Sequence, residues 1–258
     1  MFKTIEILSE NEEYLRCRIV EPDLDEKVGL NHLLIFMVHG FPGNKDGQGD
    51  VFNDLAFLLK DKGFHSLSID LRGCGESDGL QEKFTLSTAR ADLQATLEWA
   101  KSQGYERFIF IGEGLGAILP LMDLNDEVVC FILLWPILDL SYTAKVIFNA
   151  EEIKDESKKA GYIVKDKNRI GIPFVDELQK TDITHILQEV DRPLLVMHGA
   201  ADKVAPIDRL DYLRGYVKSR RVEITSFQDG THGLPALNHR KAMHFHILQF
   251  IEKYASWL

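Results

Sequence analysis

The sequence has 258 residues, of which 45% are hydrophobic and 27% are charged. This balance fits one globular α/β domain with a sizeable core, and it excludes a disordered or collagen-like chain. Asp and Glu outnumber Lys and Arg by 40 to 30, the formal net charge is -10, and no Lys/Arg stripe follows an expected helix. We therefore expect no nucleic-acid partner.

Strands and helices are expected to alternate along the chain. Short apolar or β-branched runs predict strands at 14–20, 33–38, 64–69, 107–111, 128–134, 194–197 and 221–227. Helical spacing is found at 51–62, 87–103, 207–217 and 236–258. Strands that alternate with helices need crossover connections, so the pattern predicts a doubly wound, mainly parallel α/β sheet in a single domain, 1–258.

One segment, from 139 to 190, interrupts this alternation. It is charged and has no clear period, and it contains the run EEIKDESKK at 151–159. Because it lies between two expected strands, we expect a small inserted cap over the carboxyl ends of the strands. A crossover helix with a long loop is the alternative, although long structureless loops are uncommon in compact domains.

The sequence also indicates a compartment. Charges interrupt every apolar stretch of the opening residues MFKTIEILSENEEY, which is not the pattern of a signal peptide. No apolar run approaches the roughly 20 residues that a membrane helix needs. The three cysteines, Cys17, Cys74 and Cys130, are odd in number and widely spaced, which favours reduced thiols over disulfides or a zinc site. We expect a cytoplasmic protein without a membrane partner.

Residues 107–117, RFIFIGEGLGA, place a strand before three closely spaced glycines and a small-residue helix start. This is the context of the nucleophile elbow, G-x-S-x-G, in which flanking glycines permit a tight turn and the central side chain stands above the sheet. The central residue here is Gly114, where serine is expected. The strand-turn-helix context therefore fits the elbow, but the nucleophile itself is missing.

Three other motifs follow strands and supply the remaining parts of such a site. HGFPG at 39–43 follows an expected strand, so the N–H groups of Phe41 and Leu115 are candidate oxyanion-hole donors. HGAADKVAP at 198–206 offers Asp202 as the orienting acid. DGTHG at 229–233 offers His232 as the base. The order elbow, acid, base is the order found in α/β-hydrolases.

On these motifs and on DLRGCGESDG at 70–79, the chain resembles the α/β-hydrolase superfamily over nearly its whole length. It is most similar to the small-lid branch that includes cinnamoyl and feruloyl esterases and serine aminopeptidase-like hydrolases. The resemblance implies hydrolysis of a small-molecule ester or acyl compound at the carboxyl edge of the sheet, with Asp202 and His232 in the triad and the acyl or aryl group under the lid. We expect no metal and no other cofactor.

Several residues compete for the catalytic roles. Asp139 is the rival acid, because members of this fold can place it after the preceding strand. Asp202 has a structural alternative, since it could cap a helix that begins near Pro206. The carboxylate of Glu113 could act as a nucleophile, but its side chain should point away from the position of Gly114. Cys74 and Ser77 could replace the hydroxyl only if their loop folded into the site.

Aromatic residues and histidines have similar alternatives. Trp135 and Tyr142 are candidate substrate-binding residues, and Phe41, Phe148 and Phe174 could extend an aromatic pocket, although aromatic residues near strand ends more often belong to the core. Three further histidines belong to the last expected helix. Their spacing gives no i, i+4 pair, so we expect them on a helix surface rather than on a metal; they are His239, His244 and His246.

Glycine at position 114 has a direct chemical consequence. No acyl-enzyme can form there, and only an oxyanion hole and a histidine able to polarise water would remain, so the chain as written is expected to be inactive or nearly inactive. Glycine also adopts the positive φ of an elbow at little steric cost. Two origins are open: an engineered Ser→Gly variant, or a natural non-catalytic pseudo-hydrolase that binds a small molecule or a protein.

Overall fold

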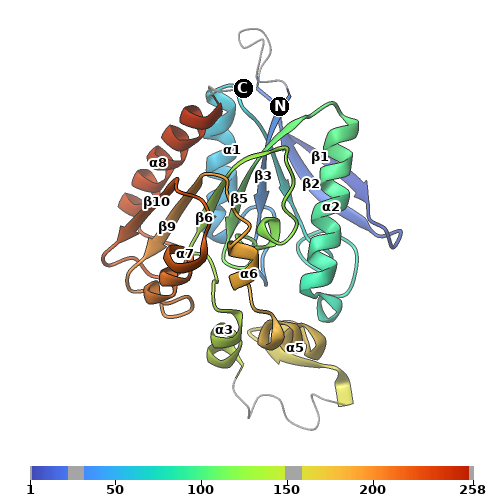
Figure 1. The fold of residues 1–258 in the computed structure, drawn as a ribbon. Helices are drawn as coiled ribbons and strands as arrows, with labels where there is room; N and C mark the ends of the chain where they lie inside the picture. Colours follow the sequence, from blue (N-terminus) through green and yellow to red (C-terminus); the bar gives the residue numbers. More distant parts are fainter. Residues whose placement is uncertain (1, 23–31, 149–158, 256–258) are drawn as a thin grey trace.

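The structure is a computed structural model that describes residues 2–22, 32–148 and 159–255. These residues form an eight-stranded sheet in the order β1-β2-β4-β3-β5-β6-β9-β10 (Figure 1). The strands are β1 (Phe2–Leu8), β2 (Tyr14–Val20), β3 (Leu33–Val38), β4 (His65–Ile69), β5 (Arg107–Glu113), β6 (Val128–Leu134), β9 (Leu194–Gly199) and β10 (Val222–Phe227). In this order, each strand from β4 to β10 is parallel to its neighbour. Strand β1 is antiparallel to β2, and β2 is antiparallel to β4. The predicted doubly wound, mainly parallel sheet is confirmed.

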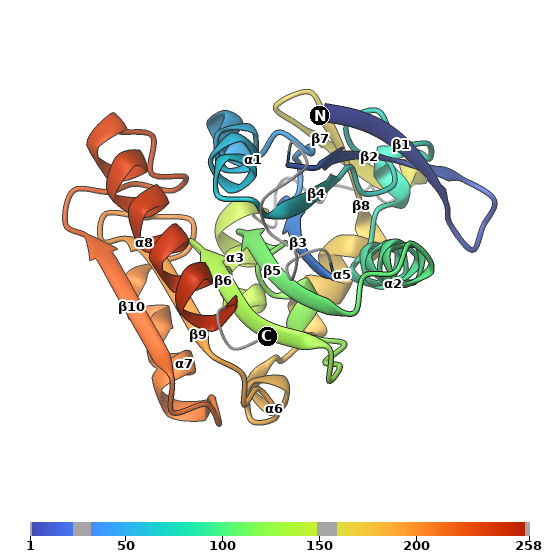
Figure 2. The same cartoon turned by 90° about the horizontal axis from the view of Figure 1, so that it is seen from above.

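Helices cover both faces of this sheet, as the view from above shows (Figure 2). On one face, α1 (Val51–Asp61) and α8 (Leu237–Ala255) pack on strand side chains such as Ile111. On the other, α2 (Leu86–Ser102) and α7 (Asp211–Tyr216) pack on side chains such as Phe36. Strand β3 is buried along its whole length, which is why its apolar residues do not alternate with polar ones.

Two local predictions are wrong. Strand β1 was not expected, and it pairs antiparallel with β2 at the edge of the sheet with only Ile7 buried. The helix expected directly after Gly114 is a set of turns followed by a short 3₁₀ helix, Leu119–Leu121. Pro120 lies inside this stretch and has no N–H to donate to the carbonyl four residues earlier, so a regular α-helix cannot pass through it.

The segment between β6 and β9 carries regular elements. They are α3 (Leu140–Ile147), the antiparallel hairpin of β7 (Tyr162–Lys165) and β8 (Asn168–Gly171), α5 (Ile172–Lys180) and α6 (Thr184–Leu187). Figure 1 shows α3 and α5 beyond the end of the sheet at which the parallel strands finish. Residues 151–158 of the charged run and residues 256–258 of the last expected helix lie outside the described residues.

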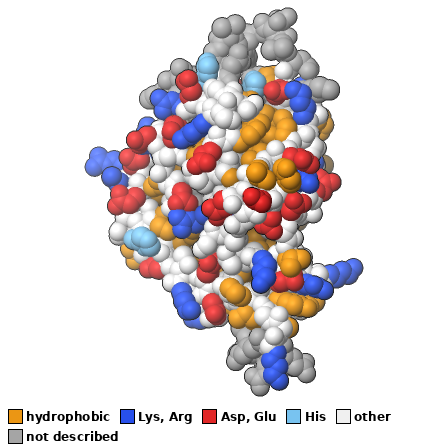
Figure 3. Space-filling model, turned by 90° about the vertical axis from the view of Figure 1, so that its right-hand side faces the viewer, with side chains coloured by type: hydrophobic (Ala, Val, Ile, Leu, Met, Phe, Trp, Pro, Cys, Tyr) orange, Lys and Arg blue, Asp and Glu red, His pale blue; other side chains and the backbone are white. Residues whose placement is uncertain are grey.

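Surface charge is mixed on the face drawn in Figure 3, where acidic and basic side chains are interspersed and neither sign forms a continuous patch. This arrangement agrees with the acidic net charge of the chain, and no basic stripe crosses that face. Within the described part of the chain, no helix combines the length and the apolar character that a membrane crossing requires.

Candidate functional site

The loops that follow β3, β5, β6 and β10 meet at the carboxyl edge of the sheet and enclose a cavity of about 220 Å³. In a doubly wound sheet this edge is where ligands bind. The cavity is lined by Gly40, Phe41, Pro42, Gly43, Asn44, Gly47, Gln48, Glu113, Gly114, Leu115, Trp135, Ile137 and His232. Four of the residues selected from the sequence, Phe41, Gly114, Leu115 and His232, thus border one space.

The turn after β5 has the geometry of a nucleophile elbow. Gly114 has φ +55°, its N–H donates to the carbonyl of Leu134 at 3.0 Å, and its own carbonyl accepts from the N–H of Ile137 at 3.1 Å. A Cβ at Gly116 would collide with the carbonyl oxygen of Val38. The flanking glycine is therefore required by close backbone approach, and the central one is held in the left-handed region.

A side chain would fit at position 114. A Cβ built there lies 3.8 Å from Cδ1 of Ile137 and 4.0 Å from Nε2 of His232. Both are ordinary contact distances, so no neighbour has to move. A serine hydroxyl, one bond further out, could therefore reach hydrogen-bonding distance of the imidazole.

His232 and Asp202 form a hydrogen-bonded pair. Nδ1 of His232 lies 2.7 Å from Oδ2 of Asp202, while Oδ1 of Asp202 accepts the N–H groups of Val204 and Ala205 at 2.8 and 3.0 Å. Burial raises the pKa of the Asp202 carboxyl, but the hydrogen bond and charge of His232, together with the N–H groups of Ala205 and Val204, outweigh it, so this pKa lies below its usual value. An ionised Asp202 holds Nδ1 protonated and leaves Nε2 as the nitrogen that faces the elbow.

Asp139, the rival acid, is used elsewhere. Its Oδ1 accepts the N–H of Tyr142 at 2.9 Å and caps α3, and its Oδ2 lies 3.6 Å from Nη1 of Arg209. The geometry therefore favours Asp202 as the partner of His232. The structural alternative for Asp202, a cap on the helix that begins near Pro206, is not found, because that helix has no side-chain cap and the second oxygen of Asp202 accepts the N–H groups of two loop residues ahead of it.

The two oxyanion-hole candidates border the cavity from opposite loops. Neither the N–H of Phe41 nor that of Leu115 donates a hydrogen bond within the described ranges, so both are available to a ligand oxygen. The Phe41 ring stacks on Phe84, with ring centroids 4.1 Å apart, and this contact fixes the loop after β3. Two unpaired N–H groups beside one cavity are the kind of donors that a carbonyl or carboxylate oxygen accepts from.

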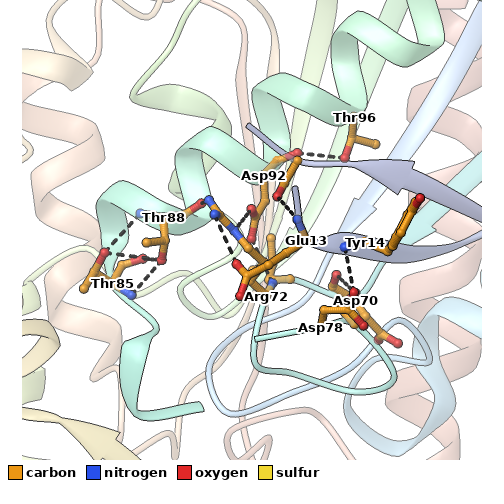
Figure 4. Close-up of polar contacts among 12 residues, drawn as sticks. Glu13, Tyr14, Asp70, Arg72, Asp78, Thr85, Thr88, Asp92 and Thr96 are labelled. Carbon is orange, nitrogen blue, oxygen red and sulfur yellow. Dashed lines mark hydrogen bonds and ion pairs between the residues drawn. The ribbon is translucent and has the colours of Figure 1, made fainter. Parts of the chain in front are cut away.

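Hydrogen bonds join the turn at 70–79 to the loop after β3, which carries Phe41. Buried Asp70 accepts the backbone N–H of Lys45 at 2.5 Å and its Nζ at 2.6 Å, and Nε2 of buried His39 accepts the N–H of Leu71 at 3.1 Å. Burial lowers the pKa of His39, consistent with a neutral ring that accepts here. In the same turn, Arg72 lies between Asp92 and Glu13 (Figure 4). The loop is thus fixed before any ligand arrives.

Glu113 and Arg240 hold the backbone N–H and the backbone carbonyl of one residue, Gln48, and we call this contact the Gln48 clamp. Both carboxylate oxygens of Glu113 accept the N–H of Gln48, at 3.0 and 3.1 Å. Nη2 of Arg240 donates to the carbonyl of Gln48 at 2.5 Å, and its Nε donates to the carbonyl of Leu234 at 3.0 Å. The clamp therefore joins the elbow, the loop after β3 and the loop that carries His232.

The clamp explains the surroundings of Glu113. Burial raises the pKa of this carboxyl, while the N–H groups of Gln48 and Gly40 and the charge of Arg240 act in the opposite direction. Its oxygens are occupied by the Gln48 N–H, so a nucleophilic role is not supported. Gln48 and Arg240 were missed by the sequence analysis, because their link spans residues 48, 113 and 240 and no local pattern marks it.

The other candidate nucleophiles lie away from the cavity. Cys74 is buried, and burial raises the pKa of its thiol to about 12. Ser77 donates its hydroxyl to the carbonyl of Asp70 at 2.5 Å and accepts the N–H of Arg16 at 2.7 Å. Neither lines the cavity, so neither offers a nucleophile to that space.

The aromatic candidates separate into two groups. Trp135 is buried, lines the cavity and has φ +38°, an unusual value for a residue other than glycine. Tyr142 does not line it, and the Arg209 guanidinium lies 4.5 Å from the centre of its ring. Phe148 and Phe174 are buried in the core.

Among the histidines of α8, the surface expectation is wrong for His239. This residue is 5% exposed, and its Nε2 lies 3.0 Å from Oδ1 of Asp229. The loop ahead of the helix thus supplies an acidic partner that helical spacing alone did not reveal. Across the described ranges, no three His, Cys, Asp or Glu side chains are grouped so that they could hold a metal ion.

Comparison with known proteins agrees with this geometry. The sequence pattern of the family described as "alpha/beta hydrolase fold" matches residues 34–121. Est1E from Butyrivibrio proteoclasticus, solved with ferulic acid bound, superposes with a TM-score of 0.82 at 19% identity, covering 98% of this chain and 99% of that one. The chain therefore has the α/β-hydrolase fold.

Individual relatives are distant in sequence. The chain is 25% identical to the non-heme chloroperoxidase CPO-A1 of Kitasatospora aureofaciens, over 85% of its own length and 92% of that protein. The mouse α/β hydrolase domain-containing protein 10 superposes with a TM-score of 0.78 at 20% identity, covering 97% of this chain and 99% of that one. Identities this low carry the fold, and the chemistry has to be argued from the residues of this chain.

Proposed function

We propose that this protein is a serine-hydrolase-type scaffold for carboxylic esters or related acyl compounds, which is inactive or nearly inactive because its nucleophile position holds Gly114. The observation that carries the proposal is the space above Gly114, where a Cβ would lie 4.0 Å from Nε2 of His232. Nδ1 of the same ring is paired with Asp202. Base, acid and oxyanion donors surround a position that lacks only a hydroxyl.

With serine at 114, the chemistry would follow from these positions. His232 would take the hydroxyl proton at Nε2 while the oxygen forms a bond to the ester carbonyl carbon, and Asp202 would stabilise the resulting imidazolium. The N–H groups of Phe41 and Leu115 would receive the oxyanion. His232 would then return the proton to the departing alcohol, and water would release the acid by the same steps.

The test is to install the hydroxyl with Gly114→Ser and to measure hydrolysis of short and aromatic p-nitrophenyl esters. We expect a gain on the order of 10²- to 10⁴-fold over the parent, because the new hydroxyl would join the proposed base, acid and oxyanion donors. Gly114→Ala is the matched control, since it adds the same Cβ without the oxygen. If the serine variant is no faster than the alanine variant, the proposal is wrong.

A second candidate is a natural pseudo-hydrolase that binds a small acyl compound or a protein without turning it over. One observation favours it: the N–H groups of Phe41 and Leu115 remain unpaired beside the cavity. The carbonyl or carboxylate of a ligand could accept from them without any nucleophile. A gene that encodes serine at position 114 would contradict this second candidate, because the glycine would then be engineered.

A further inference from the structure

Three phenylalanine rings from separate segments meet beside the candidate site, and we call them the aromatic cluster. Phe41 belongs to the loop after β3, Phe84 precedes α2, and Phe174 lies in the first turn of α5. The ring centroids of Phe41 are 4.1 Å from those of Phe84 and 5.0 Å from those of Phe174, and the last two are 5.2 Å apart. One pair is stacked and two are edge-to-face, the arrangements that aromatic rings prefer. Each ring therefore restrains the other two.

The aromatic cluster is buried at one end and reaches the cavity at the other. Phe84 is 2% exposed and Phe174 is 3% exposed, whereas Phe41 is half-buried. Phe41 lines the cavity, and neither Phe84 nor Phe174 is among its lining residues. Phe174 can therefore act on the cavity only through the ring of Phe41.

Hydrogen bonds tie the segment between β6 and β9 to the chain on both sides of Phe84. Glu177 on α5 accepts the N–H of Leu86 at 2.6 Å, and Oε1 of Gln81 accepts the N–H of Arg169 at 2.7 Å. Figures 1 and 2 accordingly show α5 close to the start of α2. Phe84 and Phe174 thus form one unit, on which the ring of Phe41 rests.

The two candidate oxyanion donors are held in different ways. Leu115 belongs to the elbow, where Gly114 is hydrogen-bonded through both its N–H and its carbonyl, and the Leu115 carbonyl accepts the N–H of Ile118 at 3.1 Å. Within the described ranges, neither the N–H nor the carbonyl of Phe41 makes a backbone hydrogen bond. The contacts with the turn at 70–79 hold His39 and Lys45, on either side of Phe41. The orientation of the Phe41 peptide therefore depends on its ring.

We propose that Phe174 is a positioning residue, through which α5 holds the N–H of Phe41 where the oxyanion forms. The oxyanion hole is complete only while α5 lies against the Phe41 ring, so a displacement of this helix withdraws one donor and leaves the other in place. The inference rests on the proposed function, because it assigns to α5 the control of a donor that the proposed reaction uses.

The test compares two measurements in the Gly114→Ser background. The first is kcat and KM with p-nitrophenyl acetate. The second is the inhibition constant of trifluoroacetone, a ketone to whose carbonyl carbon the serine oxygen would bond while His232 takes the hydroxyl proton. The former carbonyl oxygen then carries the negative charge that the N–H groups of Phe41 and Leu115 would receive.

Phe174→Leu removes both ring contacts of Phe174. We expect kcat to fall about tenfold with little change in KM, because a misplaced donor weakens binding of the transition state more than binding of the ester. The inhibition constant of trifluoroacetone should rise by about the same factor, since its adduct uses the same donor. Phe174→Met should restore most of kcat, because the flexible thioether can fill the gap and contact the Phe41 ring.

Phe148→Leu is the matched control. It makes the same change at the end of α3, at a side chain that is 5% exposed and has no ring contact with the aromatic cluster in the described part of the chain. It should leave kcat and the inhibition constant within about twofold of the background. Both leucine variants should lower the melting temperature by similar amounts, so stability alone would not separate them.

Three results would overturn the inference while the proposed function stands. Equal kcat values in the two leucine variants would show that Phe174 has no special role. A fall in kcat with an unchanged inhibition constant would place its effect outside the oxyanion hole. A rise in KM alone would mean that Phe174 affects binding of the ester instead. If Gly114→Ser hydrolyses no ester, the proposed function is wrong and the inference fails with it.

Discussion

The elbow after β5 and the acid–base pair after β9 and β10 lie at the same edge of one sheet, but they differ in what they retain. At the acid–base pair every polar atom that the role requires has its partner: Asp202 binds His232 with one oxygen and two loop N–H groups with the other. At the elbow the backbone turn is complete, yet Gly114 presents no side chain. Under the proposed function, the site therefore lacks one functional group, while its surroundings are organised.

The largest expected effect concerns activity in the Gly114→Ser background. There, His232→Ala should remove the gained ester hydrolysis, a loss on the order of 10³-fold, because the serine then has no base. The measurement is the initial rate with p-nitrophenyl acetate. If Gly114→Ser stays active without His232, then His232 does not act as the base for a serine at position 114.

The parent protein offers a matched measurement. If His232 activates water directly, the glycine-containing parent should show slow hydrolysis that disappears in His232→Ala. A parent rate that is the same with and without this imidazole would reject catalysis by activated water.

The next effect is structural and concerns the Gln48 clamp, which joins the two regions. Arg240→Met keeps much of the side-chain volume but leaves the carbonyls of Gln48 and Leu234 unpaired and Glu113 without its counter-charge. We expect the free energy of unfolding to fall by about 3 kcal/mol, as for other broken buried pairs. Urea denaturation measures it, with Lys241→Gln as the exposed neighbour that should change little. Equal stability of the two variants would contradict the clamp.

The pairing of Asp202 with His232 should also make the stability of the protein depend on pH. The folded pKa of Asp202 is lowered, so its pairing stabilises the protein above the unfolded pKa of about 3.9 and is lost as the pH falls through the folded value. Asp202→Asn should therefore be less stable than the parent at neutral pH, and the two should converge below about pH 4. Melting temperatures across this range test the prediction. A difference that does not shrink in acid would mean that the carboxylate charge is unimportant.

The smallest expected effect concerns the backbone conformation of Gly114 at the elbow. Gly114 has φ +55°, so Gly114→Ala should lower the free energy of unfolding by about 1 kcal/mol although the added Cβ meets no clash. Gly215 lies within α7, has open space around its Cβ position and no left-handed φ. Gly215→Ala should therefore stabilise the protein by about 0.5 kcal/mol or more. Opposite signs in denaturant titrations would confirm that conformation, rather than space, favours glycine at 114.

Sequence reasoning succeeded where function depends on short motifs at strand ends. The elbow, HGFPG, HGAAD and DGTHG each place glycines directly after a strand, so position in the chain and order alone predicted that Gly114 and His232 face one space. The alternation of strands and helices likewise predicted the sheet. In both cases the information lies within about ten residues of the chain.

It failed where the signal depends on tertiary contacts. Strand β1 buries only Ile7, so it has no apolar pattern to detect. The turn after Gly114 was expected to be helical, and Pro120 determines otherwise. Arg240 had the appearance of an ordinary helix arginine, and His239 that of a surface histidine, because their partners Gln48 and Asp229 come from other segments. Such contacts are visible only once the chain has folded.

The central claim is that position 114 lacks only a hydroxyl within an otherwise organised site. The most direct measurement is the intact mass of the protein after treatment with a fluorophosphonate, which reacts covalently with serines that a neighbouring histidine activates. We predict one adduct on the Gly114→Ser variant, located at the introduced hydroxyl, none on the parent, and none on the Gly114→Ser/His232→Ala double variant. A correctly folded Gly114→Ser protein that forms no adduct, or forms it equally without His232, would contradict the account.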